Sequence, residues 1–352
     1  MANPTSIKIA IHHRPGSFSD RWIEYCEEKH ISYNIVNCYD NDIIEQLRSF
    51  DVLLWHWHHT DTRAILFSRQ LLLSVENMGI NVFPNTNTCW HFDDKVGQKY
   101  MLESIGAPLV PSYVFYDKKE AMDWIEKTDF PKVFKLRGGA GSANVHLIKN
   151  RSDAKKKCRI AFGKGFKANA GYFADFSTKM RKTYKKNDFW NKIKRLPSSI
   201  MDIYIANKRR WQEKGYIYFQ DFIRNNKCDT RITVIGNRAF GFRRMVRKND
   251  FRASGSGNID YDISKVNTKC VAIAFEVAGK LKSQSMAFDF VEDENSNPLI
   301  TEVSYCYLAS AVKACNGHWD KDLKRHEGAM WPEDAILEDI ISEVNRGHCY
   351  EK

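Results

Sequence analysis

Two carboxylates lie on neighbouring strand candidates in the last third of this sequence. Asp289 sits inside the apolar run 286–291, and Glu302 lies near the end of the next run, 299–303. Because an unpaired carboxylate is costly to bury among apolar residues, we expect Asp289 to have a partner. Two carboxylates on adjacent strands supply the hard oxygen ligands that Mg²⁺ prefers. The spacing predicts a magnesium site, and the alternative is a pair of edge carboxylates in water.

A lysine precedes a glycine-rich turn in the middle of the chain. Lys135 lies in the strand candidate 132–136, directly before Arg-Gly-Gly-Ala-Gly-Ser-Ala-Asn at 137–144. Glycine amides and one ammonium group at this spacing can surround a polyphosphate. The turn matches neither a Walker A loop nor the G-x-G-x-x-G of a Rossmann unit, which disfavours both kinds of nucleotide site. Taken alone, the turn is equally compatible with an ordinary hairpin.

Three histidines, His56, His58 and His59, follow the third strand candidate of the chain. An H-x-H-H pattern at a strand end lacks a fourth ligand of known position, which disfavours a metal site. We expect these side chains to line an acceptor-substrate pocket or to pack with Trp55 and Trp57.

The first 84 residues alternate strand and helix signals. Strands separated by helices of this length favour a parallel sheet with ligands at the carboxyl ends of the strands, where the histidines lie. Asp61 is the expected cap of the third helix. The predicted strands are 7–11, 33–36, 51–55 and 80–83, and the predicted helices are 20–29, 43–50 and 63–78.

The rest of the chain is predicted as a mixed α and β region. Strands 132–136 and 145–148 should form a hairpin through the glycine turn, and strands 216–223, 230–235 and 238–246 should form one antiparallel sheet. Further elements are helices 95–105, 118–127 and 269–282, strands 112–116, 285–291 and 299–303, and two helices around Pro332 in the tail 309–352.

Several short motifs occur in a fixed order between residues 85 and 304. Asp94-Lys95 opens a helix, 130–135 leads into the glycine hairpin, 219–223 follows a basic segment, Asp229-Thr230-Arg231 comes next, and 285–289 with Glu302 completes the series. In this order the motifs resemble the ATP-grasp superfamily, particularly ligases related to glutathione synthetase and the enzyme that adds glutamate to a ribosomal protein. The expected fold class is therefore α/β of the ATP-grasp kind. An N-terminal α/β domain, 1–84, would precede two α+β subdomains that grip ATP, 85–150 and 215–352, with 151–214 inserted between them.

The resemblance also implies a role for each motif residue. Two lysines would contact the phosphates of ATP under the glycine hairpin, which closes as a lid, and adenine would lie between two sheets. The implied ATP-binding set is Lys95, Lys135, Gly138, Gly139, Gly141, Ser142, Gln220, Asp221, Phe222, Ile223 and Asp229. For Asp229, a structural pair with Arg231 is an equal alternative to a ribose contact.

The metal set implied by the resemblance is Asp289, Glu302 and Ser304. Relatives usually carry Asn where this chain has Ser304, so the third ligand would be the hydroxyl or a water. Around the reacting group we place the cations Arg231, Arg243 and Arg252, because a carboxylate and its acyl phosphate both need fixed positive charge. Arg252 precedes a second glycine-serine loop, 253–258, which would present amides to an oxyanion or would be a flexible surface loop.

Length and composition bound the class of protein. A chain of 352 residues should fold as two or three subdomains, and 43% apolar with 28% charged residues excludes a disordered, collagen-like or coiled-coil chain. The apolar stretches are far shorter than the roughly 20 residues that span a bilayer, and the amino terminus lacks an export signal. Nine cysteines without a C-x-x-C pair indicate reduced thiols and a cytoplasmic location.

The net charge of +11 is concentrated in one part of the chain. Residues 151–214 hold 19 Lys and Arg against 5 Asp and Glu, and the remainder holds 35 against 38. Aromatic residues are interleaved with these cations. We expect this segment to recognise an anionic acceptor or surface without taking a direct part in binding ATP, and the alternative is a solvated basic face.

These patterns predict an ATP-dependent ligase that joins a carboxylate to an amine through an acyl phosphate, with ATP and Mg²⁺ as cofactors. The motif 250–257 is similar to that of ATP-grasp proteins of bacterial surface polysaccharide pathways, which implies a sugar acid or polysaccharide precursor as substrate. One alternative is an ATP-grasp kinase that phosphorylates a small-molecule or sugar acceptor. Another is a nucleic-acid-binding protein that uses the basic segment, although the ATP motifs have no role in that reading.

Overall fold

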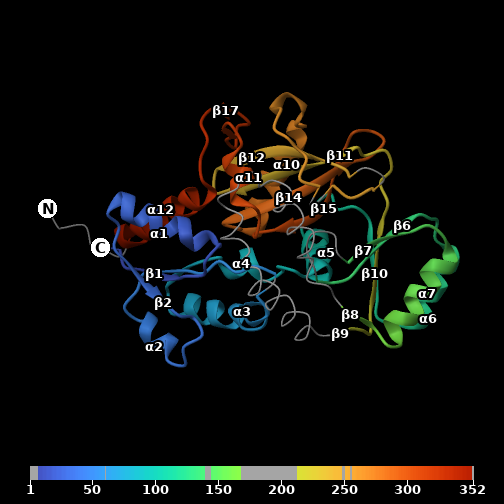
Figure 1. The fold of residues 1–352 in the computed structure, drawn as a ribbon, viewed down its shortest axis with the longest axis horizontal. Coiled ribbons are helices and arrows are strands. Elements are labelled where there is room, and N and C mark those ends of the chain that lie inside the picture. Colours follow the sequence, from blue (N-terminus) through green and yellow to red (C-terminus); the bar gives the residue numbers. More distant parts are fainter. Residues whose placement is uncertain are drawn as a thin grey trace, which may run out of the picture.

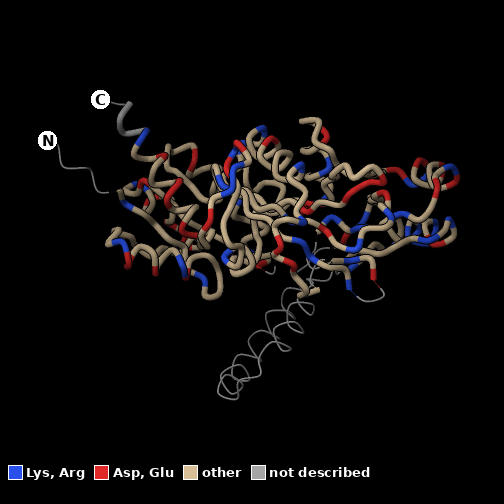
Figure 2. Tube along the Cα trace, turned by 90° about the horizontal axis from the view of Figure 1, so that it is seen from above, with Lys and Arg blue, Asp and Glu red and all other residues tan. Residues whose placement is uncertain are grey.

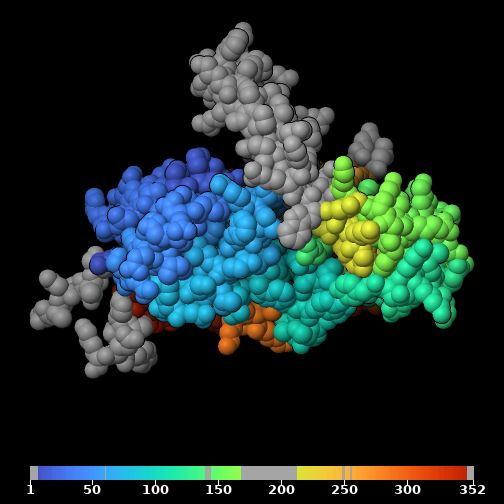
Figure 3. All heavy atoms as spheres, turned by 90° about the horizontal axis from the view of Figure 1, so that it is seen from below, coloured from blue at the N-terminus to red at the C-terminus, as the bar shows by residue number. Residues whose placement is uncertain are grey.

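A computed structural model describes residues 7–59, 61–138, 144–167, 212–247, 250–253 and 256–350. Three of the predicted lid residues, Gly139, Gly141 and Ser142, lie outside these ranges, as do residues 168–211 of the basic segment. The N-terminal unit, a large sheet and a smaller sheet follow one another along the longest axis of the described chain (Figure 1). Viewed from below, the N-terminal unit (blue) and the small-sheet subdomain (green) belong to one continuous face (Figure 3).

The N-terminal unit is a four-stranded parallel sheet in the order β2-β1-β3-β4, as predicted. Asp61 caps α3 as expected, its carboxylate accepting a hydrogen bond from the backbone N–H of Ala64 at 3.1 Å. The elements are β1 (Ile9–His12), α1 (Phe18–Lys29), β2 (Tyr33–Val36), α2 (Ile43–Leu47), β3 (Val52–Leu54), α3 (Thr62–Asn77) and β4 (Asn81–Phe83).

Two helices lead out of this unit, α4 (Thr86–Cys89) and α5 (Lys95–Ser104). Asp94 caps α5, and its Oδ1 accepts a hydrogen bond from the N–H of Gly97 at 2.9 Å. The cap makes Lys95 the first residue of the helix. One turn later, Gln98 Oε1 accepts a hydrogen bond from Val303 N at 3.3 Å, which ties α5 to β15 (Pro298–Ser304).

The small subdomain is a sheet in the order β5-β10-β6-β7, made of β5 (Ser112–Phe115), β6 (Lys132–Lys135), β7 (Val145–Ile148) and β10 (Ile217–Asp221). Its buried residues form a core with α6 (Lys118–Lys127) and α7 (Arg151–Phe162). The hairpin of β6 and β7 is confirmed. The predicted partner of β10 was wrong, because its apolar residues pair with β5 and β6 and do not extend the next hairpin.

The insertion predicted at 151–214 also needs a correction at its start. Ala154, Cys158 and Ala161 of α7 are fully buried against the small sheet, so this helix is part of the subdomain core. A two-stranded pair follows, β8 (Phe166–Lys167) with β9 (Gln212–Glu213). Residues 151–162 therefore belong to the small subdomain, and residues 168–211 lie outside the described ranges.

The large sheet runs β15-β14-β11-β12-β16-β17, and β13 pairs with β12. It contains β11 (Cys228–Ile235), β12 (Arg238–Met245), β13 (Ile259–Asp260), β14 (Ser285–Glu292), β16 (His318–Trp319) and β17 (Arg325–His326). A 3₁₀ turn (Ile263–Lys265) leads to α10 (Thr268–Leu281), which packs its apolar face on one side of this sheet. The other side faces the N-terminal unit. Helix α5 lies along the β15 edge, and its Met101 and Leu102 join the core on the α10 side.

The chain ends by returning to the N-terminal unit through α11 (Ala309–Lys313) and α12 (Pro332–Tyr350). Trp22 Nε1 of α1 donates a hydrogen bond to the Glu333 carbonyl at 3.1 Å, and Arg21 pairs with Asp334 at 2.7 Å. The predicted second tail helix is confirmed. The strands β16 and β17 were not predicted, because each has only two residues and no apolar alternation to reveal it.

Eight cysteines have described side chains, and all eight are free thiols. Within the described ranges, none of the helices combines the length and the apolarity needed to cross a membrane. Lys and Arg are interspersed with Asp and Glu throughout the described trace (Figure 2).

Candidate functional site

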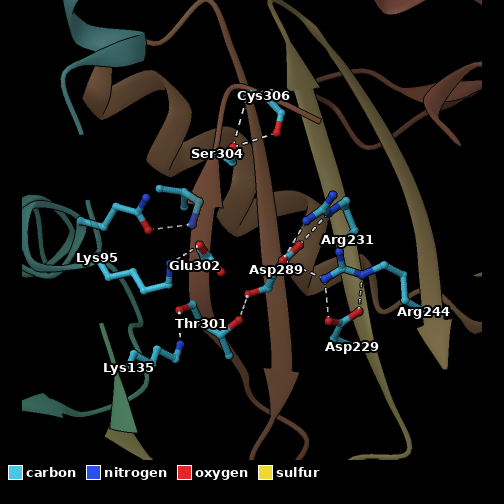
Figure 4. A network of polar contacts seen from close by, with 12 residues as sticks. Lys95, Lys135, Asp229, Arg231, Arg244, Asp289, Thr301, Glu302, Ser304 and Cys306 are labelled. Atoms are coloured by element: carbon cyan, nitrogen blue, oxygen red, sulfur yellow. Dashed lines mark hydrogen bonds and ion pairs between the residues drawn. The ribbon is translucent and has the colours of Figure 1, made fainter. Parts of the chain in front are cut away.

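Three charged side chains occupy matching positions on adjacent strands of the large sheet. Arg231 of β11 is opposite Asp289 of β14, and Asp289 is opposite Glu302 of β15. Residues directly opposite each other in a sheet point to the same face. The three side chains therefore form a row on the face turned towards α5 and the small subdomain (Figure 4).

Asp289 is held by two guanidinium groups. Its Oδ1 accepts a hydrogen bond from Arg231 Nε at 2.7 Å, and its Oδ2 accepts from Arg231 Nη2 at 2.9 Å and lies 2.7 Å from Arg244 Nη2. Burial alone would raise the pKa of Asp289, but the two arginines outweigh burial and hold this pKa below its ordinary value. The carboxylate is therefore charged at neutral pH.

Asp229 is paired as well, although not with the expected arginine. Its oxygens accept from Arg244 Nε at 2.7 Å and from Arg244 Nη2 at 2.6 Å. Arg244 is the cross-strand neighbour of Asp229, which is why it takes the place predicted for Arg231. Burial is the largest influence on Asp229 and raises its pKa.

The two predicted lysines approach the row from the other side (Figure 4). Lys95 Nζ lies 3.1 Å from Glu302 Oε1, and Lys135 Nζ donates a hydrogen bond to the Thr301 carbonyl at 3.3 Å. The register of β14 and β15 shifts between Asp289 and Phe290, which leaves Thr301 as an extra residue with its carbonyl available. Both lysines are buried, with 6% and 7% of their surfaces exposed.

The same burial acts differently on the two ammonium groups. Burial alone would lower the pKa of Lys95, but the Glu302 carboxylate, with help from Asp93, outweighs it and raises the pKa. For Lys135 burial is the dominant cause and lowers the pKa to about 8. Nearby carboxylates therefore offset the burial of the Lys95 ammonium group but not that of Lys135.

The predicted adenine-reading segment lies at the end of β10. Gln220 is buried and donates a hydrogen bond to Ser112 Oγ at 3.0 Å, and Asp221 pairs with Lys132 Nζ at 2.6 Å. The ring of Phe222 meets Phe251 edge to face at 5.7 Å. Phe251 and Arg252 come just before the glycine-serine residues 253–258, and from here on we call residues 250–258 together the second loop. The ring contact therefore joins the end of the small sheet to this loop.

Comparisons with known proteins were made against families, curated proteins and solved structures. No family model matches this chain. The alpha-aminoadipate–LysW ligase LysX of Saccharolobus solfataricus is 22% identical over 283 residues, which are 79% of this chain and 85% of that protein. The RimK domain protein ATP-grasp from Sphaerobacter thermophilus superposes with a TM-score of 0.53 at 14% identity, over 95% of this chain and 99% of that one.

A third comparison is a D-alanine–D-alanine ligase from Bacillus anthracis, solved in complex with ATP. It superposes with a TM-score of 0.56 at 12% identity, over 97% of this chain and 99% of that one. This chain has the ATP-grasp fold. The fold class implied by the order of the motifs is thereby confirmed.

The carboxylates of the charged row are compatible with a magnesium ion. Glu302 is on the strand next to Asp289, and its side chain is 36% exposed, so it can reach a ligand bound above the sheet. The Ser304 hydroxyl is used in its own turn, accepting from Cys306 N at 3.1 Å and donating to the Cys306 carbonyl at 2.9 Å. Since the described residues contain no metal-binding group of three or more His, Cys, Asp or Glu, phosphate or water oxygens would have to complete the shell.

One predicted arginine does not join this charged row. Arg243 is opposite Thr230, so it points to the α10 face of the sheet, where Nη2 bonds Asp260 at 2.5 Å. Its neighbour Arg244, which the sequence analysis missed, occupies the site face. A strand alternates its side chains with a period of two, and the shared face of Asp229 and Arg231 was the signal that could have identified Arg244.

The remaining arginine, Arg252, lies in the second loop and is paired with Asp250, Nη2 to Oδ2 at 2.7 Å. Residues 250–253 of this loop are described, whereas its Ser254 and Gly255 lie outside the described residues. The pairing lowers the pKa of Asp250 against the opposite effect of burial, which is the largest single influence.

The histidines of the N-terminal unit lie at the carboxyl ends of its strands. His56 is buried, stacks on Phe18 with ring centroids 3.8 Å apart, and accepts a hydrogen bond from the Phe18 N–H at 3.4 Å. Burial keeps the pKa of His56 well below its ordinary value. His58 and His59 have ring centroids 3.7 Å apart, and Trp55 and Trp57 pack beside each other. Of the two roles expected for these histidines, packing among aromatic residues fits the contacts of His56 better than lining a pocket.

Proposed function

We propose that this chain is an ATP-dependent ligase that joins a carboxylate to an amine through an acyl phosphate. The observation that carries the proposal is the row of charges on one sheet face. Lys95 and Lys135 approach Glu302 from one side, and Arg231 and Arg244 hold Asp289 from the other. Four cations face three carboxylates, Asp229, Asp289 and Glu302, which leaves one positive charge for an anionic substrate.

In this proposal the two lysines bind the phosphates of ATP. Lys135 is suited to this role, because it is buried and bonded only to a neutral carbonyl among its hydrogen-bond partners in the described residues. The glycine hairpin would cover the phosphates and exclude water from the acyl phosphate. Its residues in this role would be Gly138 and, outside the described residues, Gly139, Gly141 and Ser142. Asp289 and Glu302, with Ser304 or a water, would hold Mg²⁺, which would neutralise phosphate charge when bound.

Adenine would lie against the end of β10. Gln220 is held by Ser112 and Asp221 by Lys132, so their backbone groups up to Ile223 are fixed for reading the edge of a base. Asp229 would contact the ribose, because it lies on the same sheet face as Arg231. Both of its oxygens already accept hydrogen bonds from Arg244, so a ribose hydroxyl would share them with that arginine.

The reaction would proceed in two displacements. A substrate carboxylate oxygen bonds to the γ-phosphorus while the bond to ADP breaks. The amine nitrogen then bonds to the acyl carbon while phosphate leaves, and the nitrogen gives up its proton to water or a nearby base. Arg231, Arg244 and Arg252 would stabilise the negative charge that develops in both steps. The enzyme would act mainly by positioning its substrates.

The acceptor would bind between the large sheet and the carboxyl ends of the N-terminal strands, near His56, His58 and His59. We propose a sugar acid or polysaccharide precursor as the carboxylate, on the basis of the loop 250–257 and the aromatic residues of the basic segment. The ligase from Saccharolobus solfataricus is named for an amino acid, alpha-aminoadipate, which makes amino acids the competing substrate class. We place the reaction in the cytoplasm, where thiols are reduced.

The test is phosphate release from ATP and Mg²⁺ in the presence of panels of sugar acids, amino acids and amines. A ligase should release phosphate only when a carboxylate and an amine are both present. Transfer of the γ-phosphoryl group to a stable product without an amine would replace the proposal with a kinase. Absence of ATP binding by calorimetry would overturn both.

A further inference from the structure

Arg137 is the first residue of the glycine hairpin, and both of its backbone polar groups are bonded to other elements. Its carbonyl accepts a hydrogen bond from the Lys95 N–H at 3.0 Å, and its N–H donates to the Tyr216 hydroxyl at 2.7 Å. The direction in which the chain enters the hairpin is therefore set by α5 on one side and by Tyr216 on the other.

Tyr216 is in turn oriented by a carboxylate. Its hydroxyl donates a hydrogen bond to Glu213 Oε2 at 2.9 Å, and the same oxygen lies 3.7 Å from Arg137 Nε. Glu213 belongs to β9 and its side chain is only 13% exposed. Asp94 approaches the guanidinium from the opposite side, with Oδ2 3.6 Å from Nη1. Two carboxylates from different elements thus flank Arg137.

The position of Glu213 depends on a close backbone contact in the two-stranded pair that we call the neck, β8 with β9. Phe166 of β8 is opposite Glu213. Gly165 has φ +73°, and a Cβ there would lie 2.8 Å from the Glu213 carbonyl oxygen. Only glycine allows this approach. The neck encloses residues 168–211 in the sequence, so it connects the basic segment to the hairpin base.

We propose that Glu213 and Tyr216 are positioning residues for the phosphate-binding hairpin. The chain of contacts runs from β9 through the Tyr216 hydroxyl to the backbone N–H of Arg137, the residue at which the hairpin begins. This inference rests on the proposed function, in which the hairpin covers ATP. It is compatible with the expectation that residues 151–214 take no direct part in binding ATP, because Glu213 would act through Arg137 without touching the nucleotide.

The experiment compares two ligands on the full chain by calorimetry. AMP-PNP with Mg²⁺ reports on the phosphates and the adenine pocket, whereas adenosine reports on the adenine pocket alone. Tyr216→Phe removes the acceptor of the Arg137 N–H, and Glu213→Gln removes the charge that orients Tyr216. Each variant should raise the Kd for AMP-PNP roughly three- to tenfold, the range expected for one lost hydrogen bond, and leave the Kd for adenosine within about twofold.

Matched controls separate this effect from general damage. Tyr116→Phe makes the same change on another wall of the cavity of ≈ 340 Å³ that Tyr216 and Glu213 line. Glu126→Gln removes a carboxylate that pairs with Arg151 and Lys155 in the same subdomain. Both controls should bind AMP-PNP as the wild type does. Gly165→Ala leaves Glu213 and Tyr216 chemically intact but displaces β9, and it should weaken AMP-PNP binding as they do.

The outcomes distinguish this inference from the proposed function. A wild-type chain that binds neither ligand would overturn the proposed function and this inference with it. A wild type that binds AMP-PNP, together with Glu213→Gln and Tyr216→Phe variants that bind it equally well, would overturn the positioning role alone. Equal loss of adenosine and AMP-PNP would do the same, since it would indicate a structural role. If Tyr216→Phe does not fold, the result for Glu213→Gln decides whether the positioning role holds, because this substitution conserves the shape of the side chain.

Discussion

The buried charges of the site differ in how well they are compensated. Asp289 and Asp229 accept hydrogen bonds from Arg231 and Arg244 at 2.6–2.9 Å, so each carboxylate meets a cation. Lys135 donates its hydrogen bond to the neutral carbonyl of Thr301 instead. An ammonium group buried without a bonded carboxylate destabilises the free protein, and a bound polyphosphate would remove that cost.

Replacing Lys135 by methionine should therefore stabilise the protein in the absence of nucleotide. Its pKa is about 8 in the folded chain, against roughly 10.4 when unfolded, so the unfolded state binds the proton more tightly between these values. The cost is complete below about pH 8, on the order of 3 kcal/mol, and it is relieved as the pH rises towards 10.4. Urea unfolding should give Lys135→Met a larger free energy of unfolding than the wild type near neutral pH. This difference in free energy should become smaller as the pH rises towards about 10.4.

The control is Lys119→Met, which replaces an exposed lysine of α6. The difference in free energy of unfolding between Lys119→Met and the wild type should not change with pH. A difference of constant size for Lys135→Met across this pH window would contradict a lowered pKa for Lys135.

Glu302 should determine the magnesium requirement. Removing its charge in Glu302→Gln should raise the Mg²⁺ concentration for half-maximal turnover roughly tenfold or more, because a charge-assisted contact is lost. In the wild type, ATP with Mg²⁺ should raise Tm more than either alone, by mass action. Asp289→Asn should act in the same direction and also destabilise the fold, since Arg231 and Arg244 lose their shared partner.

Glu276→Gln is the matched control for Glu302→Gln, because Glu276 is an exposed carboxylate of α10 paired with Lys280. Its magnesium requirement should equal that of the wild type. A Glu302→Gln variant with the same requirement would remove Glu302 from the metal site.

At the scale of elements, strand register decides which arginine takes part in the site. Arg243 and Arg244 are adjacent in β12, yet one is opposite Thr230 and the other opposite Asp229. A shift of one residue would exchange their faces. The bulge at Thr301 acts similarly, because it keeps Glu302 opposite Asp289 while freeing a carbonyl for Lys135.

Substituting each arginine by lysine tests this assignment. Arg244→Lys keeps a positive charge but cannot bridge Asp229 and Asp289 with the same fork of donors, so turnover should fall about tenfold or more. Arg243→Lys should stay within about twofold of the wild type. Melting curves recorded in parallel confirm that both variants fold. Equal loss of turnover in the two variants would argue against the face assignment.

At the scale of the whole molecule, residues from both ends of the described chain pack into one core, in the N-terminal unit. The core of the N-terminal unit includes residues of α12 and of the large sheet, such as Ile336, Phe240 and Ala287. The N-terminal unit is thus packed on the site-bearing sheet by residues far apart in sequence. The positive excess lies in 151–214, largely outside the described residues.

Charge reversal at Lys182, Lys185 and Lys186 tests the role of that segment. If it recognises an anionic acceptor, the three Lys→Glu changes should raise the acceptor KM, more so at low salt, because exposed charges are screened over about 10 Å at 0.1 M. The KM for ATP should stay within about twofold. An acceptor KM that is insensitive to both the substitutions and salt would indicate a solvated basic face.

The sequence by itself determined the order of elements and most of the charged residues of the site. Periodicity located β1 to β4 and α10, caps located α3 and α5, and apolar flanks marked Asp289 and Glu302, because these are local signals along the chain. The choice of Arg244 over Arg243 follows from the two-residue turn that places Ile235 opposite Arg238, which is a local feature of the chain. Only the tertiary structure decided which strands share a sheet. The pairing of β10 with β5 and the contact of Glu213 with Arg137 join segments that are distant in sequence, and no local pattern encodes them.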